Sequence, residues 1–349
     1  MHKVQERARP ATSAARGVPV RVFSGIQPTG VVHLGNYVGA IRQWAQLQRE
    51  HESYFCIVDL HAITTPYDPS AFPQQVLEAA AVNVAAGIDP QQSVLFIQSH
   101  VIEHTELMWL LNILTPLGQL ERMTQFKEKS RRVRAGIMAG LLNYPVLQAA
   151  DVLLYKAALV PVGEDQVQHV ELMRDIAERF NKQFGETFPL PGVRLTKGAR
   201  ILALNDPTAK MSKSVPGSYI ALVDDPETIR KKVRAAVTDP GPPTKGSKLD
   251  DASPGVANLF TLLDAFAPAR HPEFADAYQA GTIRYSDLKQ VLAEAIVQTF
   301  APVRDKYASL MQRPDDLRAL LAHGADRARP VAAATMEEVR ARMGLRGAT

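Results

Sequence analysis

The chain is poor in cysteine and lacks any long apolar run. Its 349 residues include one cysteine, Cys56, and no apolar stretch approaches the ~20 residues that a membrane-spanning helix requires. A single cysteine makes neither an intrachain disulfide nor a zinc cluster, and its surroundings in the segment YFCIV predict a buried thiol. These absences exclude a disulfide-rich secreted domain, speak against a membrane protein and favour the reducing cytoplasm.

The charge is only mildly basic. The 40 Lys and Arg residues exceed the 36 Asp and Glu residues by four, so a polyanionic partner is permitted but not demanded. With 46% hydrophobic residues the chain can bury a substantial core, and its length suggests about two domains. Residues 1–20 are rich in Arg and Ala without an apolar period, and we expect a disordered extension there. Glu6 and the weak amphipathicity argue against a transit peptide.

The first half of the chain alternates apolar strands with helices. The strands expected from the pattern cover 21–26, 54–63 (running into a loop), 93–99, 159–163 and 199–204. The helices expected between them begin near His33, near residue 73, after Pro145 and near residue 164. Strands that are apolar throughout predict a parallel sheet covered on both faces. We therefore expect a doubly wound, Rossmann-like α/β domain over 21–208.

The pattern of apolar residues changes in the second half of the chain. A loop at 209–217 is followed by a region in which every later apolar pattern is helical, and we assign 218–345 to an all-helical domain. The helices expected at its C-terminal end cover 257–267, 272–280, 286–312, 315–329 and 335–344.

Two short segments could carry chemistry. The letters HLGN, His33 to Asn36, follow a strand and a Gly- and Pro-bearing turn and open a helix, whose N–H groups and dipole attract phosphate. Taken alone, this segment is as well explained by a plain strand-to-helix turn. The letters KMSKS, Lys210 to Ser214, place two flexible cations in a loop that could close over phosphates, although such lysines usually face solvent.

Together the two segments resemble the signatures of class I aminoacyl-tRNA synthetases. Further blocks resemble the bacterial tryptophanyl enzymes of that class, namely FSGIQPTG, GNYVGAIRQW, CIVDLHAIT, LERMTQFKEKS, YPVLQAADVLLY and VPVGEDQVQHVELMRDIAERFN. The resemblance runs from about residue 21 to 345. It implies a ligase that activates L-tryptophan with ATP and Mg²⁺, and then transfers tryptophan to the 3′ adenosine of tRNA(Trp).

The resemblance also assigns the ATP site. It implies phosphate or transition-state contacts from His33, Asn36, Lys129, Lys210 and Lys213. It places around the rest of the nucleotide the residues Gln27, Gly35, Asn36, Gly163, Asp165, Ile201 and Ser212, with adenine over Gly35. No protein-held metal is implied, because Mg²⁺ would travel on the ATP phosphates. In-line attack of a carboxylate on the α-phosphorus needs positioning and charge neutralisation rather than an acid–base dyad.

For tryptophan, the resemblance points to Asp151. Indole offers one N–H donor and no acceptor, and a carboxylate in an apolar wall answers it with a charge-assisted bond. The surrounding slot is implied to consist of Phe23, His61, Tyr144, Gln148, Val160, Val162 and Gln166, the last at the substrate's ammonium. Many relatives have methionine at Gln148 and glutamine at Leu60, so the fine shape of the pocket is left open.

Several features have more ordinary explanations. His100 and His104 have metal-binding spacing but no third ligand, and Trp44 and Trp109 are expected to be packing residues. The basic runs 131–134 and 230–234 are expected to be solvated faces, with tRNA phosphate contact as the alternative for the first run.

The resemblance further implies a homodimer around LLNILTPLGQLERM and anticodon recognition by the helical half. Two other functions stay open. One is a tyrosyl-tRNA synthetase, and the other is a synthetase-like paralogue that forms an adenylate or binds a protein partner.

Overall fold

The computed structural model describes residues 19–130, 136, 138–195, 201–213 and 215–345, except the side chain of Lys129. The expected disordered extension therefore lies almost wholly outside the described residues, and so does the basic run 131–134. Among the described helices, none is both long and apolar enough to cross a bilayer.

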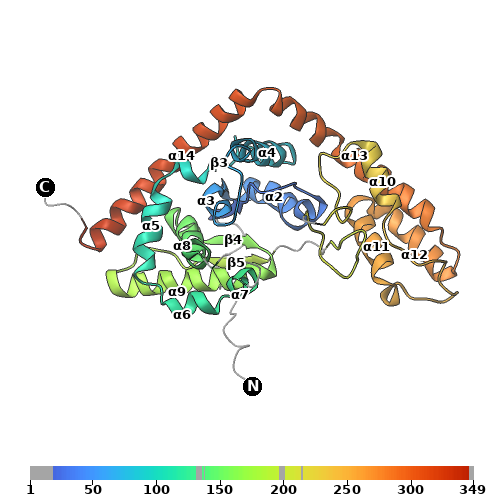
Figure 1. The fold of residues 1–349 in the computed structure, drawn as a ribbon, viewed down its shortest axis with the longest axis horizontal. Coiled ribbons are helices and arrows are strands. Elements are labelled where there is room, and N and C mark those ends of the chain that lie inside the picture. Colours follow the sequence, from blue (N-terminus) through green and yellow to red (C-terminus); the bar gives the residue numbers. More distant parts are fainter. Residues whose placement is uncertain (1–18, 131–135, 137, 196–200, 214, 346–349) are drawn as a thin grey trace, which may run out of the picture.

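A five-stranded parallel sheet forms the centre of the first half, in the order β3-β2-β1-β4-β5 (Figure 1). Its strands are β1 (Arg21–Ile26), β2 (Glu52–Ile57), β3 (Val94–Ile97), β4 (Leu159–Val162) and β5 (Gly192–Leu195). The doubly wound parallel fold is confirmed. The expected last strand at 199–204 is wrong over 201–204, the part of it that the structure describes, because Leu202 makes only an isolated bridge to Lys210 there. The fifth strand lies earlier.

Both faces of the sheet are buried, which explains why its strands lack polar alternation. Along β2, Phe55 and Ile57 join one apolar core, whereas Tyr54 and Cys56 join the other. The predicted burial of Cys56 is confirmed, since its side chain is fully enclosed. Figure 1 shows α2 and α4 over one face, and α8 and α9 over the other.

The helices of this half are short near the sheet edge and long on its faces. They are α1 (Leu34–Asn36), the π-helix η1 (Tyr37–Ile41), α2 (Arg42–Glu50), α3 (Asp59–Ala62), α4 (Phe72–Ala85), α5 (Glu103–Asn112), α6 (Leu117–Arg122), α7 (Thr124–Ser130), α8 (Ala139–Leu154) and α9 (Val167–Phe184). Helix α8 begins six residues before Pro145, not after it as expected. Its buried apolar face from Leu141 to Leu154 outweighs the ~3 kcal/mol that an interior proline costs.

The second half contains α10 (Pro226–Arg234), α11 (Pro254–Phe266), α12 (His271–Ala280), α13 (Tyr285–Met311) and α14 (Pro314–Arg342). The two helices expected at 315–329 and 335–344 are one continuous helix that passes through Pro330. Small residues buried on one side of α14, Ala325, Ala328 and Ala332, keep it packed on both sides of that proline.

Helix α14 leaves the helical half and returns to the sheet (Figure 1). Gly324 approaches the carbonyl of Leu95 on β3 so closely that a Cβ there would overlap it. Arg327 Nη1 donates to the carbonyl oxygens of Pro90 and Ser93, each at 2.9 Å. The helix thus covers the β3 edge, which would otherwise expose unpaired backbone groups. The division into domains at 208 and 218 stays a prediction, and α14 bridges the two parts.

Candidate functional site

The carboxyl ends of the five parallel strands meet at one edge of the sheet, where ligands bind in open α/β folds. Gln27 follows β1, Gln98 follows β3 and Gly163 follows β4. Asp59 and His61 follow β2 within α3. Of the residues expected at the site, Gln27, His61 and Gly163 therefore lie at this edge.

The HLGN and KMSKS segments are far apart in the sequence but adjacent in the structure. His33 pairs with Ala221 in an antiparallel bridge, just beyond the KMSKS loop. The loop is anchored from within by Met211, which is buried and whose N–H donates to the Ile201 carbonyl at 3.2 Å. The Met211 Cβ lies 3.8 Å from the position that a Cβ would take at Gly35. The two segments thus form one surface.

His33 is buried where α1 begins, and its N–H donates to Asn36 Oδ1 at 3.1 Å. Burial and the nearby charges of Lys210 and Lys213 lower its pKa from 6.5 to about 4. The imidazole is therefore neutral near pH 7. Its Nδ1 has no hydrogen-bond partner among the described residues, so one polar atom in the signature turn remains for a ligand or water.

The KMSKS loop lies against the QPTG turn. Lys213 Nζ donates to the Thr29 carbonyl oxygen, and it lies 3.1 Å from Thr29 Oγ1. Gly30 has a φ of +72°, and a Cβ there would overlap the Lys213 side chain. Lys210 is exposed on the same loop. Two cations thus flank the HLGN turn, the arrangement that polyphosphate binding needs.

The remaining expected nucleotide residues are less closely assembled. Asp165 accepts hydrogen bonds on Oδ2 from Gln125 at 3.2 Å and from Gln166 at 3.0 Å. Gln166, expected at the substrate's ammonium, thus pairs with Asp165 here. Ile201 is buried and Gln27 is exposed. The Lys129 side chain lies outside the described residues, although its backbone belongs to α7.

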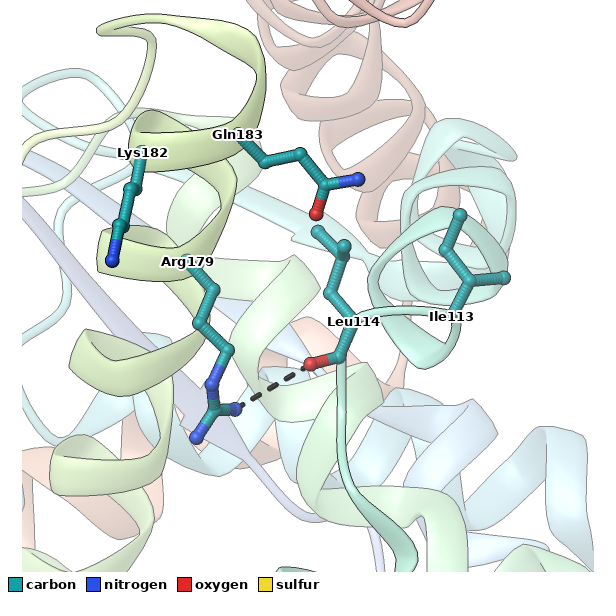
Figure 2. Close-up of a pocket in the computed structure, with 5 residues that line it drawn as sticks. All are labelled: Ile113, Leu114, Arg179, Lys182 and Gln183. Carbon is teal, nitrogen blue, oxygen red and sulfur yellow. Dashed lines mark hydrogen bonds between the residues drawn. The ribbon is translucent and has the colours of Figure 1, made fainter.

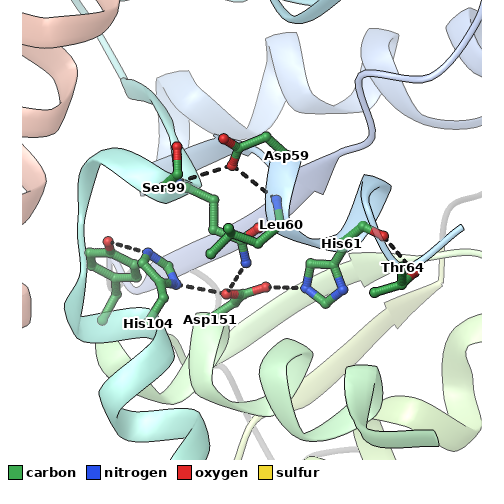
Figure 3. Close-up of polar contacts among 9 residues, drawn as sticks. Asp59, Leu60, His61, Thr64, Ser99, His104 and Asp151 are labelled. Carbon is green, nitrogen blue, oxygen red and sulfur yellow. Dashed lines mark hydrogen bonds and ion pairs between the residues drawn. The ribbon is translucent and has the colours of Figure 1, made fainter. Parts of the chain in front are cut away.

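Asp151 is the centre of a buried polar group, which we call the Asp151 cluster: Asp151, His61, Gln98, His104 and Tyr155. Figure 3 shows Asp151 between His61 and His104. His61 Nε2 lies 2.7 Å from Asp151 Oδ2, and His104 Nδ1 lies 2.7 Å from Oδ1. Gln98 Nε2 donates to Oδ1 at 2.6 Å, and His104 Nε2 lies 2.9 Å from the Tyr155 hydroxyl. The carboxylate expected from the sequence in an apolar wall is held by three side chains.

The electrostatics of Asp151 follow from these contacts. Its side chain is almost fully buried, which by itself disfavours the charged form. The attraction of His61 and the hydrogen bonds from His104 and His61 outweigh that cost, and they hold the Asp151 pKa well below its usual range. Asp151 is therefore an ionised acceptor in an apolar wall.

Two of the residues expected to line the tryptophan slot lie on the same helix as this carboxylate. Tyr144, Gln148 and Asp151 are spaced four and three residues apart, so they share one face of α8. Burial raises the pKa of Tyr144 to about 12, and its hydroxyl lies 3.0 Å from His169 Nε2. Gln148 is half-buried.

From the sheet, Phe23 stacks on Tyr155 with 5.6 Å between ring centroids. Val160 is buried and Val162 is half-buried on β4. The apolar residues expected for the slot therefore lie on strands β1 and β4, whereas Tyr144, Gln148 and Asp151 lie on α8.

Sequence reasoning missed Gln98 and His104. His104 was weighed only as half of a metal pair with His100, yet it is fully buried and faces Asp151, whereas His100 is exposed. Within the described part of the chain, no group of His, Cys, Asp and Glu side chains could hold a metal ion. Gln98 could have been found, because it is a polar residue directly after an apolar strand, at the edge where the site forms.

Two further expectations need correction. Trp44 is buried as expected, but Trp109 is 68% exposed and is not a packing residue within this chain. In the basic run 230–234, two of the cations are paired rather than simply solvated. Arg230 Nε donates to Glu294 at 2.6 Å, and Lys232 Nζ donates to Asp224 at 2.5 Å.

Comparison with known proteins decides the family. The model of the family described as tRNA synthetases class I (W and Y) matches residues 15–301. The chain belongs to this family. It is 46% identical over 330 residues to the tryptophan–tRNA ligase of Gloeobacter violaceus, covering 94% of this chain and 97% of that protein. It is also 46% identical over 327 residues to the tryptophan–tRNA ligase of Bacillus anthracis, covering 93% and 98%.

A solved structure agrees with these relatives. The tryptophanyl-tRNA synthetase of Campylobacter jejuni, complexed with ADP and tryptophan, superposes with a TM-score of 0.82 at 36% identity. The match covers 93% of this chain and 99% of that one. As a class I tRNA synthetase, the chain brings its two signature segments together at the carboxyl edge of the sheet, with the Asp151 cluster at the same edge.

Proposed function

We propose that this class I synthetase is a tryptophan–tRNA ligase, which forms tryptophanyl-adenylate from L-tryptophan and ATP and then charges tRNA(Trp). The observation that carries the proposal is the ionised, buried Asp151 among apolar and aromatic walls. A carboxylate there recognises a lone N–H donor within a flat apolar ring. The identity of 46% to tryptophan–tRNA ligases supports the same substrate.

ATP binds across the surface where HLGN and KMSKS meet. Adenine lies over Gly35, where the missing side chain leaves room beside His33, and Gly163, Asp165 and Ile201 border the nucleotide. Lys210 and Lys213 reach the phosphates from the loop, together with Ser212, Gln27 and Asn36. Lys129 adds a further cation from α7. Lys213 exchanges its contact with Thr29 for phosphate oxygens, which keeps the lysine hydrogen-bonded in both states.

The first step of the proposed reaction takes place at the α-phosphorus of ATP. The tryptophan carboxylate attacks the α-phosphorus in line, the bond to the bridging oxygen breaks, and pyrophosphate leaves with the developing negative charge. Lys210 and Lys213 stabilise that charge, and the neutral His33 donates to it without carrying a cation into the site. Mg²⁺ bound to the phosphates supplies further charge neutralisation when present. In the second step a ribose hydroxyl of the terminal adenosine displaces AMP from the adenylate.

Tyrosine is the nearest alternative substrate, because the family includes both specificities. A phenol hydroxyl donates and accepts, whereas indole only donates. Three donors hold Asp151 as an acceptor. A site that offers an acceptor and no donor matches indole, whereas a phenol hydroxyl would also need a donor. We therefore favour tryptophan.

A second copy of the chain covers the apolar face of α5 and α6. Trp109, Ile113 and Leu117 are each about 60% exposed or more. Beside them lies a hollow of about 450 Å³ between Ile113 and Leu114 on one side and Arg179 on α9 on the other (Figure 2). Exposed apolar patches of this kind mark protein interfaces. We propose a C2 homodimer through this face.

The transfer RNA makes two kinds of contact. Its acceptor end reaches the catalytic part, 21–208, and the loop 209–217, while the helical part, 218–345, reads single-stranded anticodon bases. Helix α14 connects the two, since it contacts both. We place this activity in the cytoplasm, where the protein's single thiol stays reduced.

The test is amino-acid-dependent exchange of pyrophosphate into ATP. We expect exchange with tryptophan alone among the twenty amino acids, followed by charging of tRNA(Trp). Exchange with tyrosine instead would establish the alternative ligase, and exchange without charging would indicate an adenylate-forming paralogue. Asp151→Ala should lose selectivity for tryptophan over phenylalanine, and unchanged selectivity would remove Asp151 from its proposed role.

A further inference from the structure

We propose that His104 and Gln98 are positioning residues for substrate recognition, which hold one oxygen of Asp151 so that a single acceptor position is left for the indole N–H. This inference rests on the proposed function, since it concerns how the same carboxylate selects its ligand. Neither residue was expected from the sequence, and both lie behind the pocket rather than in it.

The first argument counts acceptor positions. An ionised carboxylate offers about four lone-pair positions, two on each oxygen. Asp151 Oδ1 receives Gln98 Nε2 at 2.6 Å and His104 Nδ1 at 2.7 Å, so both of its positions are taken. Oδ2 receives only His61 Nε2, at 2.7 Å. Among the described residues, one position therefore remains on Asp151, and it is on Oδ2.

The second argument is where that open position faces. The His61 side chain, which shares Oδ2, is 12% exposed, whereas the His104 side chain, on Oδ1, is fully buried. The His61 ring lies 6.3 Å from the ring of Tyr144, edge to face, so it adjoins another residue proposed to line the tryptophan slot. Oδ2 thus lies on the side of these proposed slot residues, whereas Oδ1 lies on the fully buried side. Figure 3 shows His61 and His104 approaching the carboxylate from opposite sides.

The third argument concerns proton placement. Because Asp151 is ionised, the His104 Nδ1 beside it must carry the proton. The other ring nitrogen, His104 Nε2, lies 2.9 Å from the Tyr155 hydroxyl. Burial raises the Tyr155 pKa well above its usual range, so this hydroxyl keeps its proton. Tyr155 therefore holds the far side of the His104 ring while Nδ1 faces Asp151.

Gln98 supplies an independent observation. Its side chain is fully buried and its Oε1 has no hydrogen-bond partner among the described residues. Leaving a buried carbonyl without a hydrogen bond is destabilising. The amide cannot turn over to relieve this, because its oxygen would then face the carboxylate. Its placement is therefore explained by the donation of Nε2 to Asp151 at 2.6 Å.

This arrangement distinguishes ligands that have a ring N–H from ligands that lack one. With Oδ1 occupied, the carboxylate cannot rotate toward water or accept a ligand hydroxyl there. Counting only the residues that the structure describes, Asp151 then lacks one donor, and that donor is supplied by the ligand. A ligand without a ring N–H leaves that buried acceptor unpaired, which is the costly outcome. Removing the His104 donor frees Oδ1, so Asp151 can be satisfied without the indole.

The experiment compares tryptophan with its analogue in which sulfur replaces the ring N–H. The ratio of kcat/KM for the two in pyrophosphate exchange is measured for the wild type, His104→Leu, His104→Asn and the exposed control His100→Ala. We expect His104→Leu to lower the ratio about 10-fold, with a raised KM for tryptophan and an unchanged KM for ATP. His104→Asn retains a donor near the Nδ1 position and should restore most of the ratio. His100→Ala should match the wild type.

A double variant separates positioning from structural damage. If His104 acts through Asp151, then His104→Leu combined with Asp151→Asn has the same ratio as Asp151→Asn alone. Gln98→Met provides the same comparison should His104→Leu fail to fold. The inference would be overturned if the double variant lowered the kcat/KM ratio by the product of the two single effects. It would also be overturned if His104→Leu lowered the exchange rate but left the ratio unchanged. Either result would leave the proposed function in place. A wild type that does not distinguish the two ligands would overturn both.

Discussion

Met211 packs against Gly35, with its Cβ 3.8 Å from the place a side chain would occupy at that glycine. The contact ties the KMSKS loop to the HLGN turn through an apolar residue between two cationic ones. Because Met211 is buried while Lys210 and Lys213 are exposed, the loop is anchored at its centre and presents charge on either side.

Gly35→Ala should weaken ATP binding. The new methyl group would lie 3.1 Å from His33 Cε1 and Nδ1 and would occupy the surface proposed for adenine. We expect the KM for ATP to rise about 10-fold or more, with the KM for tryptophan little changed. The matched control is Gly39→Ala in η1, where a Cβ meets nothing within 4 Å. Equal effects of the two substitutions on the KM for ATP would contradict adenine binding over Gly35.

Lys213→Ala should slow activation more than it weakens substrate binding. The lysine is proposed to stabilise charge that develops on the leaving pyrophosphate, so its loss should lower kcat for exchange by about 10²–10³. The KM for tryptophan should change by less than about 3-fold. Lys231→Ala, an exposed cation on α10, serves as the control. If Lys213→Ala raised the tryptophan KM as much as it lowered kcat, the transition-state role would be lost.

The histidine of the signature turn should make folding stability depend on pH. The His33 pKa falls from 6.5 to about 4 on folding, so between these values the unfolded chain binds the extra proton. Stability is then highest above pH 6.5 and falls as the pH drops toward 4, by about 3 kcal/mol in total. Urea unfolding at pH 7 and pH 5, compared between the wild type and His33→Gln, isolates this contribution. If the free energy of unfolding fell equally in both proteins between pH 7 and pH 5, groups other than His33 would cause the pH dependence.

The exposed face of α5 and α6 should hold a second subunit. Trp109→Glu places a charge on a residue that is 68% exposed in the single chain, so the monomer should fold while the dimer dissociates. Sedimentation should shift from about twice the 38.3 kDa chain mass to the chain mass. Val237→Glu, which alters another exposed apolar residue in the helical half, should leave the dimer intact. A wild type that sediments as a monomer would refute the proposed interface.

Local pattern was sufficient for most elements and failed where packing decided. The strands β1 to β4 were expected from their continuous apolar runs, because burial on both faces leaves no polar positions to blur the signal. Helix α8 was expected to start after Pro145, and α14 was expected to break near Pro330. In both, the neighbouring elements supply enough buried contact to keep a proline inside the helix, and no local rule reports that contact.

The sequence by itself determined the parallel α/β half, the helical half, the two signature segments and Asp151 as the candidate for indole recognition. These features depend on hydrophobic periodicity and on short motifs of neighbouring residues, and both are visible in the sequence. The tertiary structure alone decided how Asp151 is held. His61, Gln98 and His104 come from three different elements that only strand order and helix packing bring together, and α14 returns to the sheet for the same reason. Contacts between residues far apart in the chain depend on that arrangement, and so the network that leaves one acceptor open could not be read from the linear order.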